Sequence, residues 1–312
     1  MRKNKTLLTV LAIITAAALA LTGCSGSKKS ESGTGTDSAK IGDPVKVGWT
    51  HHTEDAIMGH MIAILLREKL GLTVETAPNL GGTGIAHDAI IAGEIDIYPD
   101  YTGDALANVL KMDPIPDPQQ AYEAVKQGYL EKYDITWLAP TPFNNTYALA
   151  VKKSVAEQLN LSTISDLKEH APEWIISSSV EFASRELDGY PGMAKFYGFE
   201  FKEIKPMDPG LMYTAIHGGD VDVIVAFATD ARIGKFELTV LEDDKKFFPS
   251  YNAAPTIRNE VLNAHPEIEQ TLNEVFSSLD TETMIALNGK VDMDNQNPEE
   301  VAREFLKEKG FI

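Results

Sequence analysis

The sequence predicts an α/β protein built from two similar lobes with a ligand cleft between them. Residues 89–104 and 215–230 repeat one pattern at a constant offset, which aligns Gly93 with Gly219. Each copy is typical of a helix end, a glycine stop, a short apolar strand, and then an aromatic residue and an acid. Strands also alternate with helices along the chain, which predicts βαβ units and largely parallel sheets. About 270 residues follow the N-terminal segments, a length that suits two domains.

The chain begins with the layout of a secretion signal. Three basic residues precede an apolar run over residues 7–21, which is shorter than the roughly 20 residues that span a bilayer. The run ends in Leu21-Thr22-Gly23-Cys24, which resembles a bacterial lipobox closely. We therefore expect residues 1–23 to be removed as a lipoprotein signal peptide. Cys24, the only cysteine, would then be acylated and tether the protein outside the bacterial cell membrane. The alternative is a free thiol beside an ordinary cleavage site.

Residues 24–42 are small and polar, so they are predicted to form a flexible linker. The first lobe is expected to contain residues 43–146 and 250–312, and the second lobe residues 147–249. The chain would cross between the lobes twice.

The charge balance limits the kinds of partner. The formal net charge is −18, and removing Arg2, Lys3 and Lys5 with the signal peptide leaves −21. Nucleic acid is excluded as a partner because its phosphates need basic patches. A negative field raises the local concentration of cations and so favours a cationic ligand, although solubility alone also explains this charge.

The expected elements follow one another in a regular alternation. In the first half of the chain they are strands over 45–49, 72–76, 95–98, 136–138 and 146–151, and helices over 56–70, 85–91 and 119–132. In the second half they are helices over 154–159, from 165, and over 192–197, 211–217, 266–279 and 298–309, strands over 174–177 and 221–226, and a return crossing over 245–257. Asp96 and Asp222 occupy matching places in the repeat and are interpreted as structural caps.

Three motifs invite a catalytic or metal-binding interpretation that their surroundings do not support. His51-His52 and His60 lack cysteine partners and a His-Glu-x-x-His pattern, and adjacent histidines point in different directions. The loop over 81–84 precedes a helix and suits an anion, but it lacks the lysine of a phosphate-binding loop. The serines at 177–179 have no nucleophile elbow and no paired base. We therefore expect no metal, no cofactor and no catalysis.

Four aromatic residues fall where the two lobes are expected to meet. Tyr101 and Phe227 follow the repeated strand, while Tyr147 and Tyr251 lie in the two crossing segments. Ring faces that converge on one cleft attract a cation shielded by methyl groups, by about 0.5–2 kcal/mol each when water is excluded. Each aromatic residue taken singly also suits a core position. Their common placement predicts an aromatic cage.

Several motifs resemble those of a known family across residues 45–310. They are Thr53-Glu54, Asn79-Leu80-Gly81-Gly82-Thr83, the block from Gly93 to Gly103, the block from Phe143 to Leu149, Thr229-Asp230, and Tyr251-Asn252-Ala253-Ala254-Pro255. The sequence is similar to the substrate-binding proteins of glycine betaine/carnitine/choline ABC transporters, and Tyr98-Pro99-Asp100-Tyr101-Thr102-Gly103 is the most specific block.

The resemblance implies a two-lobed periplasmic-binding-protein fold, type II-like, that closes by a hinge around a ligand in the interlobe cleft. The ligand would be a quaternary ammonium compound such as glycine betaine, choline or carnitine, delivered to an ABC transporter permease. The resemblance assigns the cage and its surroundings to Tyr101, Tyr147, Phe227, Tyr251, Asn145, Thr83 and an Arg185 that pairs with a carboxylate. The alternatives are a binding protein for another cationic or zwitterionic nutrient, or an extracytoplasmic enzyme on the same fold.

Four residues depart from the family pattern. Phe227 stands where the family usually has a tyrosine, and Thr50 stands where a lysine is common. Gly84 replaces a larger polar residue, and Asp104 replaces a small hydroxyl residue that is frequent at its position. These changes remove one positive charge and add one negative charge near the polar end of the ligand. Either Arg185 faces the cleft unopposed and binds a carboxylate, or Asp104 pairs with it and favours choline-like ligands or a larger zwitterion with its own donor. We expect the first arrangement, because Arg185 matches the family motif.

Overall fold

The computed structural model describes residues 43–312. The predictions for the signal peptide, the linker and Cys24 lie outside these described residues. Among the residues it does describe, no helix is both long enough and apolar enough to cross a membrane.

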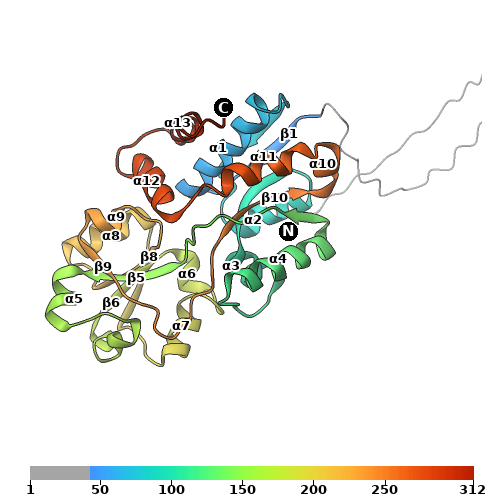
Figure 1. Ribbon diagram of the computed structural model, residues 1–312. Helices are drawn as coiled ribbons and strands as arrows, with labels where there is room; N and C mark the ends of the chain where they lie inside the picture. The colour runs from blue at the N-terminus through green and yellow to red at the C-terminus, as the bar shows by residue number, and fades with distance from the viewer. Residues whose placement is uncertain (1–42) are drawn as a thin grey trace, which may run out of the picture. The chain divides into compact units, whose positions relative to one another are not determined.

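The first sheet contains five strands in the order β2-β1-β3-β10-β4. Strands β1 and β10 of this sheet are labelled in Figure 1. Its strands are β1 (Val45–Gly48), β2 (Val74–Ala77), β3 (Ile97–Tyr101), β4 (Ile135–Trp137) and β10 (Ala253–Arg258). Strand β1 runs parallel to β2 and β3, whereas β10 runs antiparallel to β3 and β4. Its helical segments are α1 (Thr53–Glu68), α2 (Thr83–Ile91), α3 (Thr102–Asp104), a π-helix (Ala105–Leu110), α4 (Pro118–Tyr133), α10 (Asn259–Ala264), α11 (Glu267–Phe276), α12 (Thr281–Asp292) and α13 (Pro298–Glu308).

The second sheet repeats this topology with the order β7-β6-β8-β5-β9. Its strands are β5 (Tyr147–Lys152), β6 (Ile175–Ser178), β7 (Glu203–Pro206), β8 (Val223–Phe227) and β9 (Leu238–Val240). Strand β6 is parallel to β7 and β8, and β5 is antiparallel to β8 and β9. Its helical segments are α5 (Lys153–Leu159), 3-10 helices over Ile164–Glu169 and Ala171–Glu173, α6 (Val180–Ser184), α7 (Tyr190–Tyr197), α8 (Pro209–Gly218) and α9 (Arg232–Lys235). The helix expected from residue 165 is therefore a 3-10 helix.

The sequence repeat corresponds to one structural unit in each lobe. Gly93 and Gly219 follow helices α2 and α8 in the left-handed conformation, with φ of 73° and 84°. Asp96 accepts a hydrogen bond from the backbone N–H of Lys46, and Asp222 accepts one from Ile175, both at 2.8 Å. Each aspartate thus ties the start of its strand to the neighbouring parallel strand, which agrees with the interpretation as structural caps.

The strand expected over 95–98 was placed too early in the sequence. Strand β3 spans Ile97–Tyr101, and its antiparallel partner β10 pairs with it as far as Ala253↔Tyr101. This pairing keeps the chain extended through Pro99, which sequence patterns alone assign to a break. Tyr101 and Phe227 are accordingly the last residues of their strands, β3 and β8, rather than residues beyond them.

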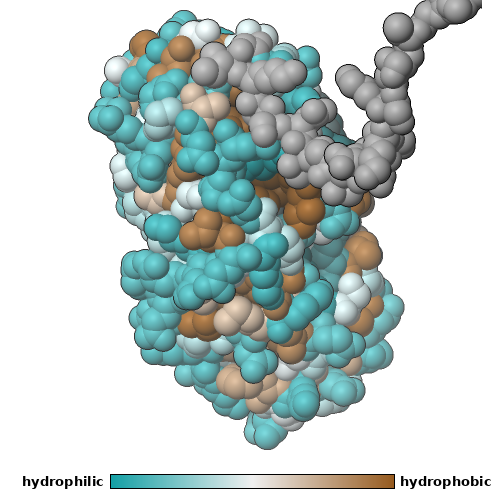
Figure 2. Space-filling model, turned by 90° about the vertical axis from the view of Figure 1, so that its right-hand side faces the viewer, coloured by the Kyte–Doolittle hydropathy of each residue, from teal (hydrophilic) through white to brown (hydrophobic). Residues whose placement is uncertain are grey.

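The two crossings occur at β5 and before β10. Strand β5 begins at Tyr147 and belongs to the second sheet, while β10 begins at Ala253 and belongs to the first. The exact lobe boundaries at 146/147 and 249/250 stay a prediction. Figure 2 shows a face of the molecule that is mostly hydrophilic, with hydrophobic residues interspersed, as the acidic composition leads one to expect.

Candidate ligand-binding site

A cavity of about 260 Å³ is lined by residues from both lobes. It includes every ligand-binding residue expected from the sequence: Thr83, Tyr101, Asp104, Asn145, Tyr147, Arg185, Phe227 and Tyr251. The structure therefore brings together side chains from strands β3, β5 and β8, from helices α2 and α3, and from the loops before β5, β10 and α7.

Three of the aromatic rings meet around Tyr147. Its ring centroid lies 5.4 Å from that of Phe227 and 5.4 Å from that of Tyr251. Strand pairing explains the first contact, because Tyr147 is directly opposite Phe227 in the β5–β8 ladder. Tyr251 is fixed by its backbone, whose C=O accepts from Asn145 N–H at 3.0 Å. Tyr101, only 9% exposed, also lines the cavity.

Protein groups already bond the hydroxyls of the three tyrosines. Tyr101 donates to Glu54 at 2.7 Å and to Asp55 at 2.9 Å, and Tyr251 donates to Asp188 at 2.5 Å. Tyr147 accepts from Arg185 Nη1 at 3.0 Å. Burial raises the pKa of all three phenols, so they are neutral at physiological pH. The hydroxyl protons of Tyr101 and Tyr251 are therefore already engaged, and these two rings offer mainly their faces and edges to a ligand.

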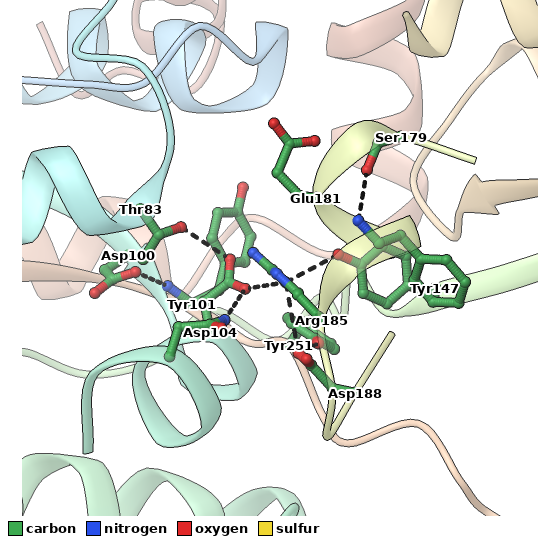
Figure 3. Close-up of polar contacts among 12 residues, drawn as sticks. Thr83, Asp100, Tyr101, Asp104, Tyr147, Ser179, Glu181, Arg185, Asp188 and Tyr251 are labelled. Atoms are coloured by element: carbon green, nitrogen blue, oxygen red, sulfur yellow. Dashed lines mark hydrogen bonds and ion pairs between the residues drawn. The ribbon is translucent and has the colours of Figure 1, made fainter. Parts of the chain in front are cut away.

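Arg185 is paired across the cavity, contrary to the arrangement we expected. Its Nη1 lies 2.6 Å from Asp104 Oδ1 and 3.5 Å from Asp188 Oδ2 (Figure 3). Asp104 faces the cavity because α3 begins directly after β3, and its carboxylate also accepts from Thr83 Oγ1 at 3.1 Å and Asn108 Nδ2 at 3.3 Å. Burial disfavours the charged guanidinium, but Asp104, Tyr147, Asp188 and Tyr251 together outweigh burial and raise the pKa of Arg185.

Two adjacent acids, Glu54 and Asp55, form a buried pair beside the Tyr101 hydroxyl. Glu54 accepts from Asn145 Nδ2 and Asn288 Nδ2, both at 2.8 Å, and burial raises its pKa. Burial also raises the pKa of Asp55 to about 6, although Thr50 and Tyr101 donate hydrogen bonds to it. The sequence pointed to Glu54 only through the family motif and gave no reason to select Asp55.

Helix α12 supplies two cavity residues that the sequence interpretation missed, Asn288 and Asp292. Asn288 Nδ2 also donates to the backbone C=O of Thr229 in the second lobe at 3.2 Å. Asp292 lies 3.4 Å from Arg232 Nη2, which pairs with Asp230 at 2.6 Å. No strong signal marked this helix, because its apolar positions do not form a clear stripe.

The histidine pair at the start of α1 also lines the cavity. Within residues 43–312, no cluster of histidine, cysteine, aspartate and glutamate is arranged to hold a metal ion. The rings of His51 and His52 instead contact each other in a tilted arrangement, with centroids 4.2 Å apart and planes at 34°.

The fold and this interlobe cavity define a substrate-binding protein of the ABC transporter type. Residues 43–308 match the model of the substrate binding domain of ABC-type glycine betaine transport systems, and the chain belongs to this family.

Relatives and solved structures agree with this assignment. The chain is 37% identical to the carnitine transport binding protein of Listeria monocytogenes, over 86% of this chain and 88% of that protein. It is 38% identical to the glycine-betaine-binding protein of Pseudomonas aeruginosa, over 86% and 89%. A crystal structure described as a glycine betaine/carnitine/choline ABC transporter superimposes with a TM-score of 0.74 at 37% identity, covering 86% of this chain and 99% of that chain. The expected family and the two-lobed α/β fold are thus confirmed.

Proposed function

We propose that this protein is an extracytoplasmic solute-binding lipoprotein that captures a quaternary ammonium compound and delivers it to the permease of an ABC importer. The observation that carries the proposal is the set of four aromatic residues that line one cavity, in which the Tyr147 ring contacts the rings of both Phe227 and Tyr251. A trimethylammonium group cannot donate conventional hydrogen bonds, and aromatic faces attract it by about 0.5–2 kcal/mol each in a site without water.

The charges around the cavity favour a cation over a zwitterion. Its two arginines, Arg185 and Arg232, are each paired with acids. The acids that line it outnumber them: Glu54, Asp55, Asp104, Glu181, Asp208, Asp230 and Asp292. A ligand carboxylate would have to displace Asp104 from Arg185, whereas a hydroxyl can donate to a carboxylate without disturbing the pair. We therefore place choline-like compounds ahead of glycine betaine.

Hinge closure is the proposed means of capture. The lobes would be residues 43–146 with 250–312, and residues 147–249. Several contacts join them around the cavity: Asp104 with Arg185, Asn288 with the Thr229 carbonyl, Tyr251 with Asp188, and Asp292 with Arg232. A ligand in the cage would add contacts to rings from both lobes and so favour the closed state.

Membrane attachment and delivery complete the proposal. Acylated Cys24, followed by the polar linker over 25–42, would hold the protein near its permease at the outer surface of the cell membrane. We infer that the ligand is released unchanged, because the relatives described above are named as transport binding proteins. Another cationic or zwitterionic nutrient remains the alternative ligand for the same cage.

A ligand screen tests this function directly. Thermal unfolding would be followed with choline, glycine betaine, carnitine and proline betaine, since a ligand at 100 times its Kd adds about 2.7 kcal/mol of stability. We expect the largest shift with choline, and titration calorimetry would give each Kd. Mass spectrometry of the recovered ligand would reveal turnover. Failure of every quaternary amine to bind would contradict the proposal.

A further inference from the structure

His52 occupies a wall of the cavity beside the aromatic rings. It is the residue that precedes helix α1, and its imidazole lines the same cavity as the cage. Its ring centroid lies 6.1 Å from that of Phe227 in an edge contact and 4.2 Å from that of His51. Because Phe227 touches Tyr147 in turn, His52 extends the line of rings.

The imidazole of His52 is free to interact with a ligand. Its backbone N–H contacts Thr50 Oγ1. Neither ring nitrogen has a hydrogen-bond partner among residues 43–312, and neither is completely shielded from solvent. The hydroxyls of Tyr101 and Tyr251 donate to protein carboxylates, and the Tyr147 hydroxyl accepts from Arg185. His52 is therefore a polar group beside these rings that still has its hydrogen-bonding capacity available.

Charges from three helices and one loop surround His52. They belong to Glu54 at the start of α1, Asp104 in α3, Glu181 in α6, and His51 beside it. Burial, and then His51, lower the pKa of His52 below its usual value near 6.5, although the three acids act in the opposite direction. At neutral pH the imidazole is thus uncharged, and it becomes a cation only in acid.

We propose that His52 contacts the bound ligand and makes the capture of a cation sensitive to pH. This inference rests on the proposed function, because it requires a positively charged ligand. The neutral imidazole adds an aromatic surface and one hydrogen-bonding nitrogen to the cage. The imidazolium places a positive charge in the same wall, where it repels the ammonium group. Affinity for the ligand therefore falls as the pH decreases.

The test compares pH profiles rather than affinities at one pH. Titration calorimetry with choline at pH 7.5, 6.0 and 5.0 would be performed on the wild type, on His52→Gln and on His52→Phe. Both variants remove the titrating charge, and phenylalanine keeps an aromatic wall. The exposed His217 lies outside the cavity lining, so His217→Gln is the matched control. Acids such as Asp55 also titrate in this range, but they contribute equally to every variant.

We expect the wild-type Kd to rise between pH 7.5 and 5.0 by about fivefold more than the Kd of either His52 variant. His217→Gln should retain the wild-type profile. Equal profiles for wild type and His52→Gln would overturn the role of His52 while leaving the proposed function intact. Absence of choline binding by the wild type at pH 7.5 would instead contradict the choline preference in the proposed function.

A second measurement does not depend on any variant folding correctly. In an NMR titration of the wild type, saturating choline should lower the pKa of the His52 ring, because linkage between proton and cation is reciprocal. A His52 pKa that does not change on choline binding would overturn the inference.

Discussion

Asp104 and Arg185 form an ion pair across the cavity, with Asp104 Oδ1 2.6 Å from Arg185 Nη1. Neither carboxylate oxygen is left without a partner, because Thr83 and Asn108 also donate to Asp104. The arginine that the family motif assigns to a ligand carboxylate is therefore already paired with a protein carboxylate. Thr83, which we expected to bind ligand, holds Asp104 in this position.

Replacing Asp104 should change which ligand is preferred. In Asp104→Thr the guanidinium of Arg185 loses its closest partner and becomes available for a charge-assisted bidentate bond to a ligand carboxylate. We expect the affinity for glycine betaine relative to choline to increase by about tenfold, which corresponds to about 1.4 kcal/mol. Titration calorimetry with both ligands on wild type and variant gives the ratio. An unchanged ratio would show that Asp104 does not set ligand identity.

The cage predicts different results for two substitutions of Tyr147. The ring lies at the centre of the aromatic group, so Tyr147→Ala should cost roughly 1–2 kcal/mol of binding, about 5–30-fold in Kd. Tyr147→Phe keeps the ring and removes only an acceptor for Arg185, so it should cost much less. Calorimetry on both variants tests this, and equal effects of the two substitutions would argue against the cage.

Tyr251 provides a contrast within the same cage. Its hydroxyl donates to Asp188 Oδ2, and Asp188 Oδ1 is already buried without a partner. Tyr251→Phe should therefore lower thermal stability more than Tyr147→Phe does, because it removes a donor from a buried carboxylate. Thermal unfolding of the two phenylalanine variants without ligand measures the difference. Equal melting temperatures would contradict this assignment of the Tyr251 hydroxyl.

The repeated aspartates should matter for stability and not for binding. Asp222→Ala removes the acceptor for the N–H of Ile175, the first residue of β6, and because this hydrogen bond is exposed the loss should cost about 0.5–1.5 kcal/mol of unfolding free energy. The exposed Asp220, two residues earlier, provides the control variant Asp220→Ala, which we expect to be nearly neutral. Urea unfolding gives both values. A weaker Kd for choline with unchanged stability would instead place Asp222 in the ligand site.

The sequence predicted the parts of this molecule that local patterns encode. The repeat around Gly93 and Gly219 predicted the matching units of the two sheets, and aromatic positions at strand ends predicted the residues that line the cavity. The partners of each side chain depend on segments far apart in sequence, so local patterns do not reveal them. Asp104 is 81 positions from Arg185, and Glu54 is bonded to Asn288 at a separation of 234.

Membrane attachment is expected to depend on one residue. Cys24 is the acylation site that the lipobox-like sequence indicates, and the polar segment after it offers no other apolar anchor. Cys24→Ala should move the protein from the membrane fraction to the soluble fraction of the cell envelope. Choline binding by the released protein should be unchanged, because the cavity residues lie beyond residue 50. Retention of the variant on membranes would point to a different anchor.

Asp100 should make folding stability depend on pH. Its carboxylate is 2% exposed and accepts from Tyr98 Oη at 2.5 Å, Tyr129 Oη at 3.2 Å and Tyr101 N–H at 2.8 Å. Burial raises its pKa to about 7, above the usual value of 3.8 for an unfolded chain. Between these values the folded state binds more protons than the unfolded state, so its contribution to stability decreases as the pH rises.

The variant Asp100→Asn isolates this contribution, because the amide resembles the protonated acid and does not titrate. We expect wild type to lose stability relative to Asp100→Asn as the pH increases from 4.5 to 7.5, by at most about 1.4 kcal/mol per pH unit. Glu54 and Asp55 titrate in both proteins, so their effects cancel in the comparison. Urea unfolding at several pH values measures the difference, and a difference that does not vary with pH would show that Asp100 is ionised throughout this range in the folded protein.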